Sequence, residues 1–178
     1  MSQGKRRLSQ ITSHLASPGT NASGVRTLTT QPIKETFRTK QDYKYFLPIQ
    51  TRWSDNDCYG HVNNSVYNHY FDTVINVYLI KHCGLDINSK TKPLGVVVAS
   101  QATFYASASY PNLITAGLTV SKIGRSSVTY RVGIFEADNP LACVVGGFTH
   151  VFVNNQDRRP VTELPDEILN GVKNLVVE

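Results

Sequence analysis

Four extended runs separated by short turns constrain the fold of this chain more than any other feature. They cover residues 96–105, 113–123, 127–136 and 141–153, and Pro, Gly, Asn and Asp mark the breaks between them. In the third run, apolar residues alternate with small or polar ones, as a half-buried strand requires. Turns this short cannot carry parallel crossovers, so the runs predict an antiparallel sheet arranged as a meander.

One long amphipathic helix is expected before these runs. Large apolar side chains between Val66 and Leu79 follow the i, i+3, i+4 spacing of a helix face. Asn63 or Asn64 can cap the start of this helix, and Gly84 is well placed to end it. The apolar face predicts a helix that packs against the sheet.

Three further features complete the predicted fold. Residues 43–53 are aromatic-rich and extended, but Pro48 interrupts them, which favours an edge strand. Residues 165–176 predict a short closing helix. Gly146 and Gly147 lie inside the last run, which predicts a bulge or a close approach of the backbone to the helix or a ligand. We therefore expect an α+β fold in which an antiparallel sheet wraps around one long central helix.

The size of the chain fits one domain of this kind. The sequence has 178 residues, of which 40% are hydrophobic and 17% charged, so most of it can bury a core. Apolar stretches such as residues 94–99 are far shorter than the roughly 18 to 20 residues that a membrane-spanning helix needs. No membrane span is expected.

The positive charge is concentrated at the N-terminus. Residues 1–40 hold seven basic residues and one acid, whereas residues 41–178 hold eleven basic and twelve acidic residues. The near-neutral body does not favour nucleic acid as a partner. The first 34 residues have no acid and many Ser and Thr, which is the composition of a mitochondrial presequence. We expect residues 1–40 to be a disordered basic tail, residues 41–178 to be the domain, and the protein to lie in the mitochondrial matrix, with a cytoplasmic location as the alternative.

Metal sites and disulfides are not expected. The three cysteines, Cys58, Cys83 and Cys143, include no C-x-x-C pair. The segment from Asp55 to Gly60 resembles the start of a calcium loop, but Tyr59 stands where the fifth position of that loop needs an oxygen ligand.

An unusual density of polar residues joins the first predicted strand to the long helix. Asp57 lies in a turn that Gly60 opens, and the first N–H groups of the following helix are unpaired donors. A carboxylate can therefore meet a site that binds a carbonyl oxygen or an oxyanion. Asp57 can equally be a helix-entry acid that forms a local turn.

This connector resembles a known family, the hotdog-fold thioesterases of the 4-hydroxybenzoyl-CoA thioesterase type. The family has an acid, two residues and Gly-His-Val-Asn-Asn before its central helix, and residues 57–64 read Asp-Cys-Tyr-Gly-His-Val-Asn-Asn. Residues 123–127 are similar to the turn between its late strands, and residues 149–153 to its last strand. The resemblance covers roughly residues 43–168 and implies a single hotdog domain.

The resemblance also implies an activity, the hydrolysis of an acyl-CoA thioester to the free acid and CoA. Asp57 matches the catalytic carboxylate, the backbone N–H near Asn64 matches the group that polarises the carbonyl, and His61 matches the motif histidine. No cofactor is implied, since CoA is part of the substrate. A homodimer or homotetramer is implied, in which CoA phosphates meet basic side chains of a neighbouring subunit. The residues expected to bind substrate are Gly60, Val62, Asn63, Tyr67, Lys122, Arg125 and Ser126.

Several alternatives stay open at this point. A hotdog hydratase acting on enoyl or hydroxyacyl thioesters, or a thioester-binding subunit without turnover, would share the fold. His61 can be a structural histidine bonded to backbone rather than a catalytic one. The acyl group, and whether the acid attacks directly or through water, are not determined by these motifs.

Overall fold

The structure, a computed structural model, describes residues 36–177 of the chain. The expected presequence falls on residues 1–35 and so lies outside the described residues. Residues 36–40 already contact the domain. Thr39 forms a bridge to Leu141, and the Tyr43 hydroxyl donates a hydrogen bond to the carbonyl of Phe37. Within the described residues, contacts with the domain thus already occur before the predicted boundary at residue 41.

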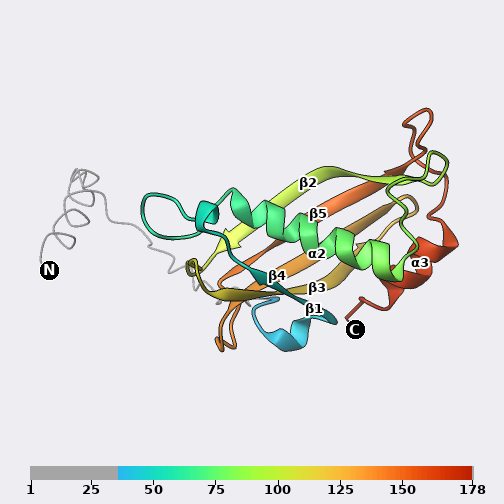
Figure 1. The fold of residues 1–178 in the computed structure, drawn as a ribbon. Helices are drawn as coiled ribbons and strands as arrows, with labels where there is room; N and C mark the ends of the chain where they lie inside the picture. The colour runs from blue at the N-terminus through green and yellow to red at the C-terminus, as the bar shows by residue number, and fades with distance from the viewer. Residues whose placement is uncertain (1–35, 178) are drawn as a thin grey trace, which may run out of the picture. The chain divides into compact units, whose positions relative to one another are not determined.

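Each predicted helix and strand is present, with slightly different ends (Figure 1). The long helix is α2 (Val66–His82), and the short closing helix is α3 (Asp166–Lys173). Two short 3-10 helices, η2 (Lys40–Asp42) and η3 (Trp53–Asp55), flank the first strand. Residues 36–177 form five strands, namely β1 (Tyr45–Gln50), β2 (Leu94–Phe104), β3 (Leu113–Ile123), β4 (Ser127–Glu136) and β5 (Val144–Val153).

All strand pairs are antiparallel, but the predicted meander is wrong for β2. The strand order is β1-β3-β4-β5-β2, so β2 pairs with β5 rather than with β3. The reason is the connection at 105–112, which crosses the end of the sheet instead of forming a tight hairpin. There, the Tyr105 and Ala106 N–H groups both donate to the carbonyl of Cys143, the residue just before β5. Pro48 lies in β1, which is an edge strand as predicted.

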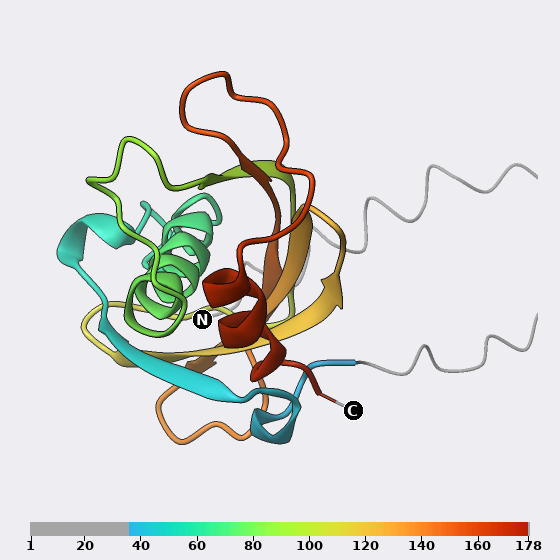
Figure 2. The ribbon, with the colours of Figure 1, turned by 90° about the vertical axis from the view of Figure 1, so that its right-hand side faces the viewer.

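The sheet curves around α2 and buries its apolar face (Figure 2). Phe71, Val74 and Ile75 are fully buried between the helix and the sheet. At Gly146 the backbone of β5 comes so close to α2 that an added Cβ would lie 2.5 Å from the Phe71 ring. Gly147 has a φ of +138°. The close approach predicted for this Gly-Gly pair is therefore confirmed, and the confirmed α+β fold is a single domain with one central helix.

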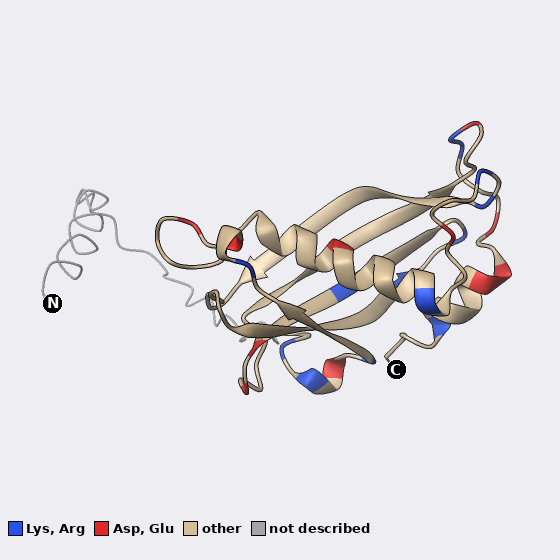
Figure 3. Cartoon of the chain, viewed as in Figure 1, with Lys and Arg blue, Asp and Glu red and all other residues tan. Residues whose placement is uncertain are grey.

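Charges of both signs are interspersed over the described residues (Figure 3). No helix among them is both long and apolar enough to cross a membrane.

Candidate active site

The loop between β1 and α2 is a small closed unit. Asn56 and Val62 form an antiparallel bridge across its base, and the Asp57 N–H donates to the carbonyl of His61 at 2.9 Å. The Gly60 N–H donates to the carbonyl of Asp57 at 3.1 Å, and Gly60 has a φ of +80°. Since a side chain is strained at this φ, glycine is the residue that lets the loop turn back. The turn predicted at Gly60 is confirmed.

The connection between β2 and β3 holds this loop against the helix. The Val62 N–H donates to the carbonyl of Ala108 at 2.8 Å, and the Ala108 N–H donates to the hydroxyl oxygen of Tyr67 at 3.1 Å. Tyr67 lies in the first turn of α2 and is 1% exposed. Its burial raises the pKa of the phenol to about 12, so the hydroxyl keeps its proton at neutral pH.

The turn just before α2 contains an N–H group that has no hydrogen-bond partner among the described residues. The Asn63 side-chain oxygen accepts hydrogen bonds from the Ser65 N–H and hydroxyl, so Asn63 orders the turn before the helix, while Ser65 stands at the cap position. The predicted capping by Asn63 or Asn64 is thus displaced by one to two residues. Within the described residues no hydrogen bond uses the Asn64 N–H. As an unpaired amide at a helix start, this group can bind a carbonyl oxygen or an anion.

A cavity of about 410 Å³ lies where these parts meet. Five of the predicted site residues line it, namely Asp57, His61, Val62, Asn64 and Tyr67. The half-buried Asp57 uses Oδ1 to accept the Tyr59 N–H at 2.8 Å, and no described hydrogen bond uses its Oδ2. Asp57, with one carboxylate oxygen unused, and Asn64, with its N–H unused, thus line the same cavity, an arrangement that suits attack on a polarised carbonyl carbon.

The remaining predicted residues lie outside this cavity. Gly60 and Asn63 shape the loop and the helix start but do not line the cavity. Lys122, Arg125 and Ser126 lie at the β3–β4 turn, at the opposite end of the sheet from Phe104. At about 3.3 Å per strand residue, this turn is roughly 25 Å from the cavity within one chain.

The cavity also has a wall that the sequence did not indicate, formed by Tyr59, Phe104, Tyr105, Ala106 and Ser107. Phe104 contacts Tyr67 edge to face, with ring centroids 5.6 Å apart. Four of these residues come more than forty positions after Asp57 in the chain. Their sequence pattern predicts a strand but does not indicate that they lie beside the Asp57 loop. Only Tyr59, inside the motif, could have been found from the sequence.

The other reactive side chains are less suited to catalysis. Asp55 is buried and already bonded to Arg52 and Tyr70. Burial raises the pKa of Cys83 to about 12 and that of Cys143 to about 11, so both thiols stay protonated at neutral pH. Among residues 36–177 no group of three or more His, Cys, Asp or Glu side chains could hold a metal ion.

Comparison with known proteins identifies the family. The model of the thioesterase superfamily matches residues 59–143. The crystal structure of the PA5185 protein of Pseudomonas aeruginosa is 42% identical, with a TM-score of 0.75, and the match covers 78% of this chain and 96% of that one. No curated protein matches the sequence significantly.

More distant structures share the fold. The DHNA-CoA thioesterase of Staphylococcus aureus is 19% identical, with a TM-score of 0.60, over 66% of this chain and 78% of that one. The protein SAV2348 of the same organism, solved in complex with CoA, is 16% identical, with a TM-score of 0.67, over 74% of this chain and 82% of that one. The predicted family is confirmed: the chain belongs to the thioesterase superfamily of hotdog-fold proteins and is a thioester hydrolase.

Proposed function

We propose that this protein hydrolyses an acyl-CoA thioester and that Asp57 is the catalytic carboxylate. The observation that carries the proposal is that Asp57 and Asn64 line one cavity, and that within residues 36–177 no hydrogen bond uses the Asn64 N–H. The Asn64 N–H would hold the carbonyl oxygen and stabilise its developing charge. Water adds to the carbonyl carbon in the overall reaction, the C–S bond breaks, and the CoA thiol leaves with a proton. No cofactor is needed for this chemistry.

The test is thiol release from a panel of acyl-CoAs by the wild-type protein and its Asp57→Asn variant. We expect kcat to fall by about 10² to 10³ in the variant, because a neutral amide can neither attack nor take a proton from water. Asp86→Asn is the matched control, since the exposed Asp86 accepts the Asn88 N–H two residues ahead, as Asp57 accepts that of Tyr59. Full activity in Asp57→Asn would move the catalytic role to another residue.

Product masses complete the test. A thioester that gains the mass of water without releasing thiol would support a hydratase instead, and CoA binding without turnover would support a binding subunit. In ¹⁸O-water, single-turnover label in the Asp57 carboxylate would show direct attack, because water labels that carboxylate by opening an Asp57–acyl anhydride at the Asp57 carbon.

We also propose that the acyl group is an aromatic, short or medium one. The cavity wall includes the aromatic rings of Tyr59, Tyr67, Phe104 and Tyr105, which suit a flat or apolar group. The CoA complex of SAV2348 supports CoA as the carrier, because that protein has the same fold.

A homo-oligomer built through β2 is the proposed form of the enzyme. β2 is an edge strand of eleven residues with no proline and no charged residue, and Val96, Val97 and Val98 on it are exposed. A long apolar edge of this kind tends to pair with another strand. The other edge, β1, has six residues and contains Pro48. A second copy pairing with β2 is therefore favoured over pairing with β1.

Such a pair would also bring the distant basic residues toward the site. Two-fold symmetry requires the two β2 strands to run antiparallel, so the Leu94 end of one lies beside the Phe104 end of the other. The β3–β4 turn lies at the Leu94 end of the sheet, whereas the cavity lies at the Phe104 end. Lys122, Arg125 and Ser126 of one subunit would then share an end of the joined sheet with the cavity of the other. This supports their proposed role in binding CoA phosphates.

The mitochondrial matrix is the proposed location, on the composition of residues 1–34. A fusion of residues 1–40 to a fluorescent protein should colocalise with mitochondria. A control fusion in which the basic residues Lys5, Arg6 and Arg7 are replaced by Gln should stay in the cytosol, because import of such segments depends on their positive charge. A diffuse signal from the unaltered fusion would favour the cytoplasmic alternative.

A further inference from the structure

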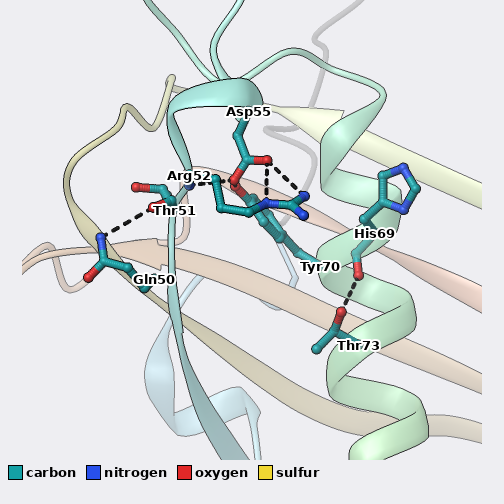
Figure 4. Close-up of polar contacts among 7 residues, drawn as sticks. All are labelled: Gln50, Thr51, Arg52, Asp55, His69, Tyr70 and Thr73. Atoms are coloured by element: carbon teal, nitrogen blue, oxygen red, sulfur yellow. Dashed lines mark hydrogen bonds and ion pairs between the residues drawn. The ribbon is translucent and has the colours of Figure 1, made fainter.

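Asp55 is a buried carboxylate two residues before Asp57. It is 1% exposed and does not line the cavity. Its Oδ2 accepts hydrogen bonds from the Arg52 N–H at 2.7 Å and the Tyr70 hydroxyl at 2.8 Å. Its Oδ1 accepts a hydrogen bond from Arg52 Nε at 3.0 Å and lies 2.9 Å from Arg52 Nη2 (Figure 4). Both oxygens are thus engaged by protein groups rather than directed at a substrate.

These bonds connect separate elements of the fold. Arg52 follows β1, and the neighbouring Thr51 hydroxyl donates to the carbonyl of Asn112 in the connection before β3, at 2.7 Å. Tyr70 lies in α2 with its ring in the core, 3% exposed. The carboxylate of Asp55 is therefore the point at which the end of β1 and the first turns of α2 are joined.

The backbone of Asp55 closes the loop that carries Asp57. Its carbonyl accepts the Asn63 N–H at 2.9 Å, directly beside the bridge between Asn56 and Val62. Beyond this base, Cys58, Tyr59, Gly60 and His61 are exposed, so few packing contacts hold the tip of the loop. The orientation of the loop then depends mainly on its base.

We propose that Asp55 is a positioning residue, which fixes the loop carrying Asp57 against the helix start carrying the Asn64 N–H. The proposal rests on the catalytic role proposed for Asp57. It explains why an acid that is buried and bonded on both oxygens lies so close to the site. Arg52 and Tyr70 act through Asp55 and share this function.

The ionisation of Asp55 suits the role. Burial acts to raise the pKa of its carboxyl, but the hydrogen bonds from Arg52 and Tyr70 outweigh burial and hold the pKa below its usual value. The group therefore stays charged at neutral pH, and its bonds to Arg52 and Tyr70 are charge-assisted, which makes them stronger than neutral ones.

The test compares two tyrosines of the same helix. Tyr70→Phe removes only the hydroxyl that reaches Asp55. Tyr78→Phe is the matched control, since Tyr78 is also buried in α2 and donates one hydrogen bond, to the carbonyl of Gly171 at 2.9 Å, far from the loop. Both variants and the wild type are assayed with the same acyl-CoA, well below their melting temperatures.

We expect Tyr70→Phe to lower kcat about tenfold or more while KM changes less than about threefold, because a misplaced carboxylate weakens the transition state more than substrate binding. Tyr78→Phe should keep kcat within about twofold of the wild type. If kcat fell equally in the two variants, the loss would come from general destabilisation of the protein, which would contradict the proposal. An unchanged kcat in Tyr70→Phe would also overturn it.

Amide hydrogen exchange gives a second readout that does not depend on turnover. In Tyr70→Phe the amides of Asp57, Val62 and Asn63 should exchange faster, while those of β4 and β5 keep their protection. If the wild type released no thiol, the proposed function would fail, yet the exchange data would still decide whether Asp55 holds the loop. Loop amides that exchange alike in all three proteins would exclude that role.

Discussion

At the scale of single residues, His150 shows how burial controls a titratable group outside the active site. It is 2% exposed in β5, among the rings of Tyr130, Phe148 and Phe152, and its Nδ1 has no hydrogen-bond partner in the part of the chain that the structure describes. Burial lowers the pKa of this imidazole, and the negative charge of Asp72 on α2 opposes that effect only in part. His150 is thus neutral in the folded protein at neutral pH.

This burial predicts a dependence of stability on pH. Below the ordinary histidine pKa of about 6.5, the unfolded chain binds a proton at His150 that the folded protein does not, so stability falls as pH decreases. One such proton contributes at most about 1.4 kcal/mol per pH unit. We expect the unfolding free energy of the wild type to fall by about 1 kcal/mol more than that of His150→Leu between about pH 7 and pH 5.5.

Urea unfolding at fixed protein concentration measures this difference. His69→Leu is the matched control, because it replaces a histidine that is exposed on α2 rather than buried. The same pH dependence in His150→Leu and the wild type would mean that His150 is protonated equally in the folded and unfolded chains.

At the scale of elements, the contact between β5 and α2 sets how close the helix lies to the sheet. An added Cβ at Gly146 would lie 2.5 Å from the Phe71 ring and 2.6 Å from the carbonyl oxygen of Gln101. The backbone of β2 and a fully buried ring therefore both block a side chain at this position. Neither neighbour can move without disturbing the core, because interiors of this kind are closely packed.

Gly146→Ala should therefore destabilise the protein by about 2 to 3 kcal/mol, the upper part of the range for overpacked cores. Gly124→Ala serves as the comparison, since the atom nearest its added Cβ is the hydroxyl of Ser127, at the end of a short side chain that can rotate. We expect the unfolding free energy of that variant to change by less than about 1 kcal/mol. If the unfolding free energy of Gly146→Ala fell as little as that of Gly124→Ala, the helix would be able to move away from β5.

At the scale of the whole molecule, the oligomer proposed above depends on the free edge of β2. Val98 is the most exposed of its three consecutive valines, at 58%, and makes little contact within its own chain. The cavity wall includes Phe104 at the end of the same strand and the adjoining Tyr105. Pairing at this edge is therefore expected to influence both the assembly and the site.

Val98→Lys should shift the protein toward monomers, because a lysine on a paired edge disfavours strand addition. Ile87→Lys is the control, since Ile87 is 71% exposed but lies in the loop after α2. Light scattering after gel filtration measures the mass, and thiol release measures the activity of the same samples. The expected result is loss of both assembly and activity in Val98→Lys alone. A wild type that is an active monomer would contradict the shared site.

The sequence by itself determined the helices and strands and the turn of the loop at Gly60. The apolar spacing of α2, the alternation in β4, Pro48 on an edge strand and the turn at Gly60 were all predictable, because each reflects a local constraint on the backbone or on one buried face. The family motif at residues 57–64 indicated the thioesterase family for the same reason, since it is contiguous in the chain.

Only the tertiary structure decided which distant parts meet. It paired β2 with β5 and placed Phe104 against Tyr67, whereas the β3–β4 turn lies at the far end of the sheet. It also distinguished the two acids of the loop. Asp55 accepts a hydrogen bond from the hydroxyl of Tyr70, fifteen positions later in the chain, whereas Asp57 lines the cavity. The spacing of apolar residues predicts which face of a helix or strand is buried. Hydrogen bonds and contacts between remote segments decide which other segment covers that face.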